Sequence, residues 1–363
     1  MKHPRHRADS PAKKSGGRFP IAAIVFSVFL LVSGAVDAAV ADTAKPAQKA
    51  PRFYWKFGTM APDGVGYSNQ INTYVMPLVT SVSRGEVKVK VHWGGSMGDD
   101  QDIMRKMRFG YLNGAGLSGQ GVTFLCPETS VLSLPFLFND YEEVDAIVKQ
   151  MGSRFESYME KSNVFLFSWL DQDFDQIYSN RPITKLSDFS KMRFLTWYGT
   201  LEEEVLRALG TKPVPVSGTL IAPAIKQGQA DAVISPAIFI VGSQMFTQLK
   251  YASTLNIRYS PAMVVIRSED WRSLPAEYVK KYYELRGAVR ERMLQDVRRN
   301  NKRFFAAITK YGIVESRISE KDKDEIRRAV TPLWRKMSGR LYPADLLDEL
   351  LVTLARYRAS KAE

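Results

Sequence analysis

The fold is decided by a stretch that opens with Lys191-Met192-Arg193-Phe194-Leu195-Thr196-Trp197 and closes with Ala230-Asp231-Ala232-Val233-Ile234-Ser235. Both segments are rich in β-branched, aromatic and apolar residues, which predicts two strands. Between them, helical periodicity at 200–209, a short strand at 213–216 and a short helix at 217–228 complete an alternating order. Alternating strands and helices predict a small parallel sheet.

Arg193 is the residue of this stretch whose side chain is best suited to bind a ligand. Because side chains alternate along a strand, Arg193 is expected on the face opposite Met192 and Phe194. A guanidinium keeps its charge and can bind a carboxylate through two parallel hydrogen bonds, so Arg193 could hold an anionic ligand. The alternative is a salt bridge to Asp188 or to one of the acids at 202–204.

The rest of the chain continues the α/β pattern. Strands are predicted at 53–59, 87–91, 164–169 and 255–267, a helix at 67–81, and a long helix at 277–311. The acidic run from Asp171 to Asp175 lacks the spacing of an EF-hand calcium loop and is predicted to be a polar turn.

The first 41 residues have the form of a signal peptide. A basic segment with six Lys or Arg precedes an apolar run at 19–32 and the small-residue site Ala39-Val40-Ala41. The apolar run is short for a membrane span, so we expect cleavage and export. The remaining 322 residues are long enough for two domains.

The scarcity of cysteine and histidine excludes several kinds of site. Beyond the leader, Cys126 is the only cysteine and His92 the only histidine, so neither a disulfide nor a typical zinc site can form within the chain. The glycine motif Gly114-Ala115-Gly116-Leu117-Ser118-Gly119 follows a predicted helix rather than a strand, which disfavours a dinucleotide site. We therefore expect no enzyme activity, no catalytic residues, no metal and no cofactor.

Positive charge is concentrated near the C-terminus. The net charge is +13, and residues from 276 onward carry 21 Lys or Arg against 13 Asp or Glu. No nucleic-acid-binding motif accompanies this charge, so we expect no nucleic-acid partner. The basic helices are expected to be solvated surface, with weak attraction to a membrane surface or an acidic partner as the alternative.

Five motifs follow one another along the chain: Ala61-Pro62, Gly94-Gly95-Ser96-Met97-Gly98-Asp99, Leu134-Pro135-Phe136-Leu137-Phe138, Asp188-Phe189-Ser190-Lys191-Met192-Arg193 and Gln227-Gly228-Gln229-Ala230-Asp231-Ala232. In this order they resemble the solute-binding proteins of tripartite ATP-independent periplasmic (TRAP) transporters, the dicarboxylate-binding family. The resemblance covers roughly residues 53 to 275.

This resemblance implies an α/β, two-lobed periplasmic-binding-protein fold with crossing strands and a long C-terminal helix. One lobe would comprise 52–165 plus 252–275, the other 166–251, and 276–363 would pack across both. The protein would be a periplasmic receptor that binds an organic carboxylate between the lobes and delivers it to membrane permease subunits. The alternatives are an envelope protein that binds lipid or another hydrophobic ligand, and, less favoured, an exported enzyme.

The resemblance also implies a set of ligand-binding residues. Arg193 would bind the carboxylate, and the other members of the predicted site are Trp197, Tyr198, Ser235, Ser118 and Gln120. Ser190 replaces a glycine that is usual in the family, and the aromatic residues after it are bulky for a small hydrophilic dicarboxylate. The ligand is therefore expected to be an organic acid of amphipathic character.

Overall fold

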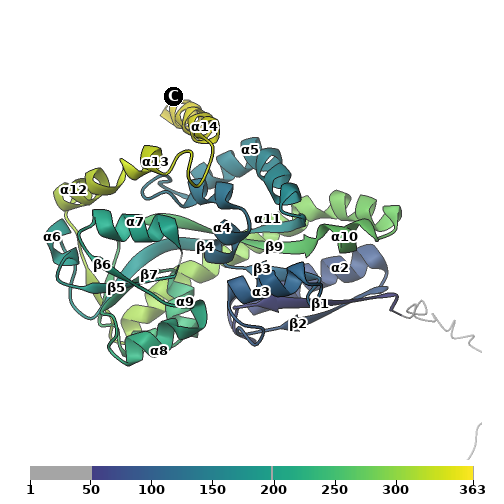
Figure 1. Cartoon of the computed structure of the whole chain (residues 1–363), viewed down its shortest axis with the longest axis horizontal. Helices are drawn as coiled ribbons and strands as arrows, with labels where there is room; N and C mark the ends of the chain where they lie inside the picture. Colours follow the sequence, from purple (N-terminus) through teal and green to yellow (C-terminus); the bar gives the residue numbers. More distant parts are fainter. Residues whose placement is uncertain (1–50, 198, 363) are drawn as a thin grey trace, which may run out of the picture. The chain divides into compact units, whose positions relative to one another are not determined.

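The computed structural model describes residues 51–197 and 199–362 (Figure 1). The predicted signal peptide at 1–41 and Tyr198 lie outside these residues. A first set of strands, sheet A, has the order β2-β1-β3-β9-β4. It comprises β1 (Phe53–Thr59), β2 (Val87–His92), β3 (Gly114–Leu117), β4 (Val164–Ser179) and β9 (Arg258–Arg267). Strands β2, β1 and β3 are parallel, whereas β9 runs antiparallel to β3 and β4.

The helices that follow β1, β2 and β3 make sheet A a series of β-α-β units. They are α1 (Tyr67–Gln70), a π-helical segment (Ile71–Val75), α2 (Met76–Ser83), α3 (Asp100–Arg108), α4 (Gly119–Leu125), a 3₁₀ segment (Pro127–Ser133) and α5 (Tyr141–Lys161). Acidic residues follow the N-cap Asp99 of α3, and three basic residues occupy its last turn, so the charges of this helix complement its dipole.

The parallel sheet predicted around Arg193 is confirmed. Strand β5 (Arg193–Thr196) lies parallel to both β6 (Lys212–Pro215) and β7 (Ala232–Ser235). The helices of this region are α6 (Leu186–Phe189), α7 (Thr200–Ala208), α8 (Ile221–Lys226) and α9 (Ala237–Gly242), with short 3₁₀ turns at Gly218–Leu220 and Met245–Thr247. The second set of strands, sheet B, comprises β4, β5, β6, β7, β8 (Tyr251–Ser253) and β10 (Val314–Ser316).

Strand β4 connects the two sets. It pairs with β9 from Val164 to Asp175, and its last four residues pair with β7, so this one strand belongs to both sheets. The prediction of a polar turn at 171–175 is wrong, because Asp171, Asp173 and Asp175 are buried within β4. Arg298 and Arg258, both distant in sequence, compensate the charges of Asp171 and Asp175, and Asp173 accepts a hydrogen bond from Tyr141.

The long C-terminal helix is confirmed as α11 (Ala276–Lys310), which contacts α2 and β4 on one side of the molecule and α9 on the other. It follows α10 (Ser268–Arg272) and is succeeded by α12 (Glu320–Val330), α13 (Leu333–Lys336) and α14 (Ala344–Ala362). Helix α14 packs on α5 (Figure 1). The lobe boundaries given above stay a prediction.

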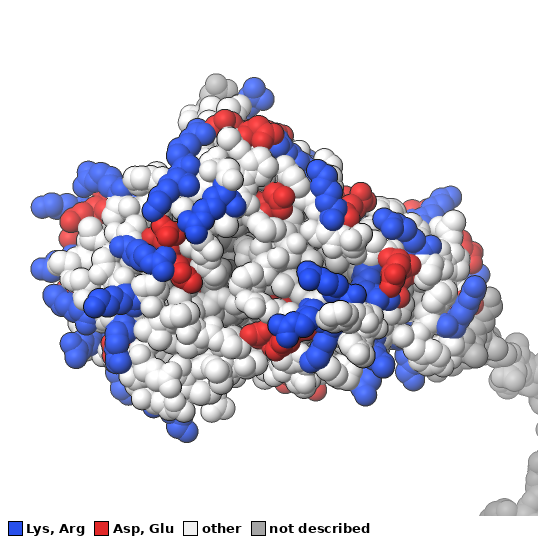
Figure 2. All heavy atoms as spheres, viewed as in Figure 1, with Lys and Arg blue, Asp and Glu red and all other residues white. Residues whose placement is uncertain are grey.

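Many basic residues of the C-terminal region are paired with acids, including Arg298 with Asp145 and Arg358 with Glu143. In Figure 2, Lys and Arg are spread over the visible face and interspersed with Asp and Glu. Membrane-surface contact by these helices stays a prediction.

Candidate functional site

A cavity of about 320 Å³, here called the cleft cavity, lies where the carboxyl ends of strands from both sheets meet. Sheet A and its loops contribute residues 59–62, 65, 67, 71, 94, 116–118, 170, 172 and 262; the region of sheet B contributes 197, 218, 219, 222, 238, 239, 242 and 243. In open α/β folds, ligands bind at this edge of the sheet. The topology therefore places the cleft cavity where a ligand site is expected.

The wall of the cleft cavity is apolar. Trp197, which follows β5, stacks on Phe239 of α9 with ring centroids 5.2 Å apart. Ile71, Leu170 and Ile238 add aliphatic surface. Among the described residues that line it, none is Lys, Arg, His, Asp or Glu. Apolar ligand surface is therefore favoured inside it.

The polar side chains at the cavity are held by hydrogen bonds to neighbouring backbone and acids. Ser118 caps α4 and donates a short hydrogen bond to Asp100, and Gln172 accepts one from the N–H of Gly119 at 2.9 Å. Burial raises the pKa of Asp100 to about 6, and the Ser118 hydrogen bond opposes this shift. These contacts fix the corner between β3 and α4, so the cavity wall is preorganised.

Arg193 is not among the residues that line the cleft cavity, and its predicted role in binding the ligand stays a prediction. Its Nε and Nη2 donate to the two carboxylate oxygens of Asp231, each at 3.0 Å, and Nη2 also donates to the Gly228 carbonyl at 2.9 Å. The side chain is 51% exposed. Hydrogen bonds from Arg193 lower the pKa of Asp231 to about 2. The guanidinium thus joins β5 to the turn before β7 and is occupied by the protein's own acid.

The remaining predicted site residues divide into two groups. Trp197 and Ser118 line the cleft cavity. Gln120 is buried in α4 and Ser235 is buried at the end of β7, and neither side chain lines it. Tyr198 lies outside the described residues. Of the five predicted side chains that the structure describes, two therefore line the cleft cavity.

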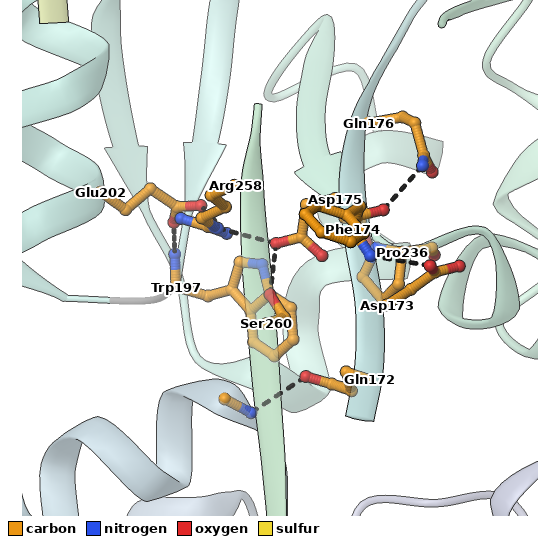
Figure 3. A network of polar contacts seen from close by, with 12 residues as sticks. Gln172, Asp173, Phe174, Asp175, Gln176, Trp197, Glu202, Pro236, Arg258 and Ser260 are labelled. Atoms are coloured by element: carbon orange, nitrogen blue, oxygen red, sulfur yellow. Dashed lines mark hydrogen bonds and ion pairs between the residues drawn. The ribbon is translucent and has the colours of Figure 1, made fainter. Parts of the chain in front are cut away.

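A buried network of polar side chains lies beside this wall, where β4 pairs with β9 (Figure 3). Arg258 donates from Nε to Asp175 at 2.7 Å and from Nη2 to Glu202 at 2.8 Å, and Ser260 donates to Asp175 at 2.7 Å. Burial raises the pKa of Asp175, whereas Arg258 lowers it. The second oxygen of Glu202 accepts the backbone N–H of Trp197 at 2.9 Å. The network therefore positions the backbone that carries the aromatic wall.

Two contacts join the regions on either side of the cleft cavity. The Ser217 hydroxyl, which follows β6, donates to Asp99 at 2.6 Å, and Asp99 is the N-cap of α3. At the other side, Gly66 lies so close to Ile238 that an added Cβ would be 2.4 Å from its Cδ1. Direct contacts therefore bridge the two sides of the cleft cavity at two places.

Comparison with known proteins identifies the family. The DctP model, bacterial extracellular solute-binding protein family 7, matches residues 57–340. The chain belongs to this family. Membership confirms the resemblance predicted from the ordered motifs and the prediction of a binding protein rather than an enzyme.

Curated relatives of this DctP family member are distant. The C4-dicarboxylate-binding periplasmic protein DctP of Rhodobacter capsulatus is 24% identical over 208 residues, covering 55% of this chain and 61% of the relative. The 2,3-diketo-L-gulonate-binding periplasmic protein YiaO of Escherichia coli is 20% identical over 203 residues, covering 55% and 62%. The chain thus spans less than two thirds of the length of these relatives.

Solved structures confirm the predicted two-lobed fold. The sugar acid binding protein DctPAm of Advenella mimigardefordensis, in complex with galactonate, has a TM-score of 0.79 at 18% identity and covers 85% of this chain and 99% of its own. A TRAP periplasmic solute binding protein of Haemophilus influenzae with bound L-gulonate has a TM-score of 0.77 at 18% identity and covers 84% and 99%.

Several residues of the cleft cavity were not predicted from this DctP-family sequence. Tyr67, Gln172, Thr219, Ile238 and Phe239 all line it. The signal that could have found Ile238 and Phe239 is their position just after β7, at the carboxyl edge of a parallel sheet. Within 51–197 and 199–362, no helix combines the length and apolar composition that crossing a membrane requires.

Proposed function

We propose that this protein is a periplasmic receptor that captures a small organic acid in the cleft cavity and delivers it to membrane permease subunits of the TRAP type. The observation that carries the proposal is the cleft cavity itself, at the carboxyl edges of both sheets in a chain of the solute-binding family. Solved neighbours with bound galactonate and L-gulonate support an organic acid as the ligand class.

The acid that fits this cavity is amphipathic. The apolar wall formed by Trp197, Phe239 and Ile238 favours a hydrocarbon or aromatic body, since burial of apolar surface contributes roughly 25 cal/mol per Å². Because no Lys or Arg is among the described lining residues, the carboxylate is not met by a guanidinium there. An isolated carboxylate is costly to bury, so the acid group belongs at the opening, where hydroxyls, backbone N–H groups and water can solvate it.

Calorimetric titration with a matched set of compounds tests this function. We expect 3-phenylpropionate to bind more tightly than the polyhydroxylated acid gluconate, because only the former has an apolar body. Ala222→Trp fills the cavity from α8 and should weaken binding by about tenfold or more, equivalent to about 1.4 kcal/mol. Ala306→Trp, at an exposed site on α11, is the matched control and should bind as the unchanged protein does. Failure of a broad panel of organic acids to bind would refute the receptor function.

A second candidate is a receptor for a neutral hydrophobic ligand, favoured by the uncharged lining of the same cavity. The amide 3-phenylpropionamide separates the two. It has the same body and no charge, so equal or tighter binding of the amide supports the neutral ligand, whereas preference for the acid supports the proposal above.

Export is the other part of the proposed function. The family is described as extracellular, which supports the predicted signal peptide at 1–41 and a periplasmic location. Mass spectrometry of the protein from a periplasmic extract should give an N-terminus after Ala41. Retention of the full-length chain in the cytoplasm would contradict export.

A further inference from the structure

A second cavity of about 320 Å³, here called the helix cavity, lies between α5 and α11 with residues 166–169 of β4 as its floor. It shares no lining residue with the cleft cavity. Its floor and one side carry the aromatic rings of Phe167, Trp169 and Tyr282, with the rings of Phe167 and Tyr282 4.7 Å apart.

Two glycines in the middle of facing helices open this cavity. Gly152 lies within α5 and Gly287 within α11, and both line it. Glycine weakens a helix relative to alanine, so a glycine at such a position calls for a packing or functional reason. A Cβ at either position would meet no atom within 4 Å. The chain's own packing therefore does not require these glycines, whereas an occupant of the cavity would use the space.

The lining of the helix cavity is cationic. Lys149, Arg286 and Arg290 line it against a single acid, Glu156. Arg286 contacts Glu156 at 3.3 Å and lies over the ring of Tyr283. Arg290 has no ion pair among the described residues, and its buried Nε has no hydrogen-bond acceptor among them. A buried donor without an acceptor is costly, and a guanidinium is suited to binding a carboxylate.

We propose that the helix cavity is a second binding site, which takes a small aromatic carboxylate. The ring would lie against Phe167, Trp169 and Tyr282, in the space left by Gly152 and Gly287. The carboxylate would accept hydrogen bonds from Arg290, with Lys149 adding positive charge. The two cavities thus differ in chemistry, because the cleft cavity has no charged lining residue among those described. This site does not depend on the function proposed for the cleft cavity.

Equilibrium dialysis with 2-naphthoate tests the site, using the whole protein. Gly287→Leu fills the cavity, and Ala288→Leu places the same side chain on the adjacent exposed position of α11. Arg290→Gln removes the unpaired cation, and Arg292→Gln removes an exposed cation of the same helix that does not line the cavity. We expect Gly287→Leu and Arg290→Gln to weaken binding by roughly tenfold or more, and the two controls to leave it unchanged.

Thermal unfolding confirms that each variant is folded, and leucine at position 287 should raise helix stability rather than lower it. The neutral 2-naphthamide should bind at least about tenfold more weakly than 2-naphthoate. The proposal is overturned if 2-naphthoate does not bind, if Gly287→Leu binds it as tightly as the unchanged protein, or if acid and amide bind equally. Binding at the cleft cavity alone would give the second of these results.

Discussion

Replacing Arg258 by leucine tests whether the buried network that joins β4, β9 and α7 stabilises the fold. Arg258 is 5% exposed, and both carboxylates that it binds, Asp175 and Glu202, are fully buried. Removing one partner of a buried ion pair typically costs about 3–5 kcal/mol, because a charge is left without compensation. Here two carboxylates lose the cation that binds them, so we expect the free energy of unfolding to fall by about 5 kcal/mol at neutral pH. That is a large part of the stability of a typical domain.

The pH dependence gives this prediction its specificity. Burial already raises the pKa of Asp175 with Arg258 present, and loss of the cation raises it further. A carboxyl whose pKa is higher in the folded state stabilises the fold below its unfolded pKa, and this contribution is lost as pH rises through the folded pKa. The loss of stability that Arg258→Leu causes should therefore be smaller at about pH 5 than at neutral pH.

Urea unfolding followed by circular dichroism at the two pH values measures both quantities. Adding Asp175→Asn and Glu202→Gln to Arg258→Leu removes the stranded charges and should recover much of the loss. Arg193→Leu, which breaks an exposed ion pair, serves as a control and should have a much smaller effect. A deficit below about 1 kcal/mol, or one that does not change with pH, would refute the reasoning.

Three further predictions concern single residues. Burial raises the pKa of Asp173 to about 7, so its carboxyl stabilises the fold below its unfolded pKa of about 4, and this contribution is lost as pH rises through 7. Asp173→Asn should therefore stabilise the protein above neutral pH and change its stability little at about pH 4. Urea unfolding that shows equal effects of the substitution at the two pH values would contradict this prediction. Arg193→Ala should leave the calorimetric affinity for the organic acid unchanged, because its guanidinium binds Asp231; a tenfold loss would return Arg193 to the site. Gly66→Ala should lower the free energy of unfolding by about 1–3 kcal/mol, and by more than Gly64→Ala does. Both glycines have positive φ, but only at Gly66 would the added Cβ meet Ile238. Equal melting temperatures of the two variants would exclude this contact as the cause.

Local sequence pattern was sufficient for most of the strands and helices. The strand at 53–59 agrees with β1, and the segment at 277–311 agrees with α11 to within one residue at each end. These segments have a single clear periodicity and well-placed turn residues, so propensity and packing favour the same structure. The ordered motifs were likewise enough to identify the family.

The errors arose where contacts distant in sequence decide the structure. The segment from Asp171 to Asp175 has the composition of a turn, yet it is a buried strand in which Arg258 and Arg298 neutralise two of the three carboxylates. Nothing local to β4 indicates those partners. For Arg193, alternation correctly gave the face opposite Met192 and Phe194, but a period of two does not say which face meets the cavity. Arg193 does form a salt bridge, but with Asp231 and not with Asp188 or the acids at 202–204.

The position of charge in this protein explains why its cleft cavity is apolar and still well defined. Beside the cavity wall, Arg258 forms ion pairs with Asp175 and Glu202, so the charges that organise this wall lie behind it and not on its surface. Glu202 also fixes the backbone at the wall, because its carboxylate accepts a hydrogen bond from the N–H of Trp197. In the function proposed above, a ligand would meet a preorganised aromatic surface, which reduces the cost of ordering that binding otherwise carries. On that proposal, selectivity at the cleft cavity would depend on the shape and apolar area of the ligand's body.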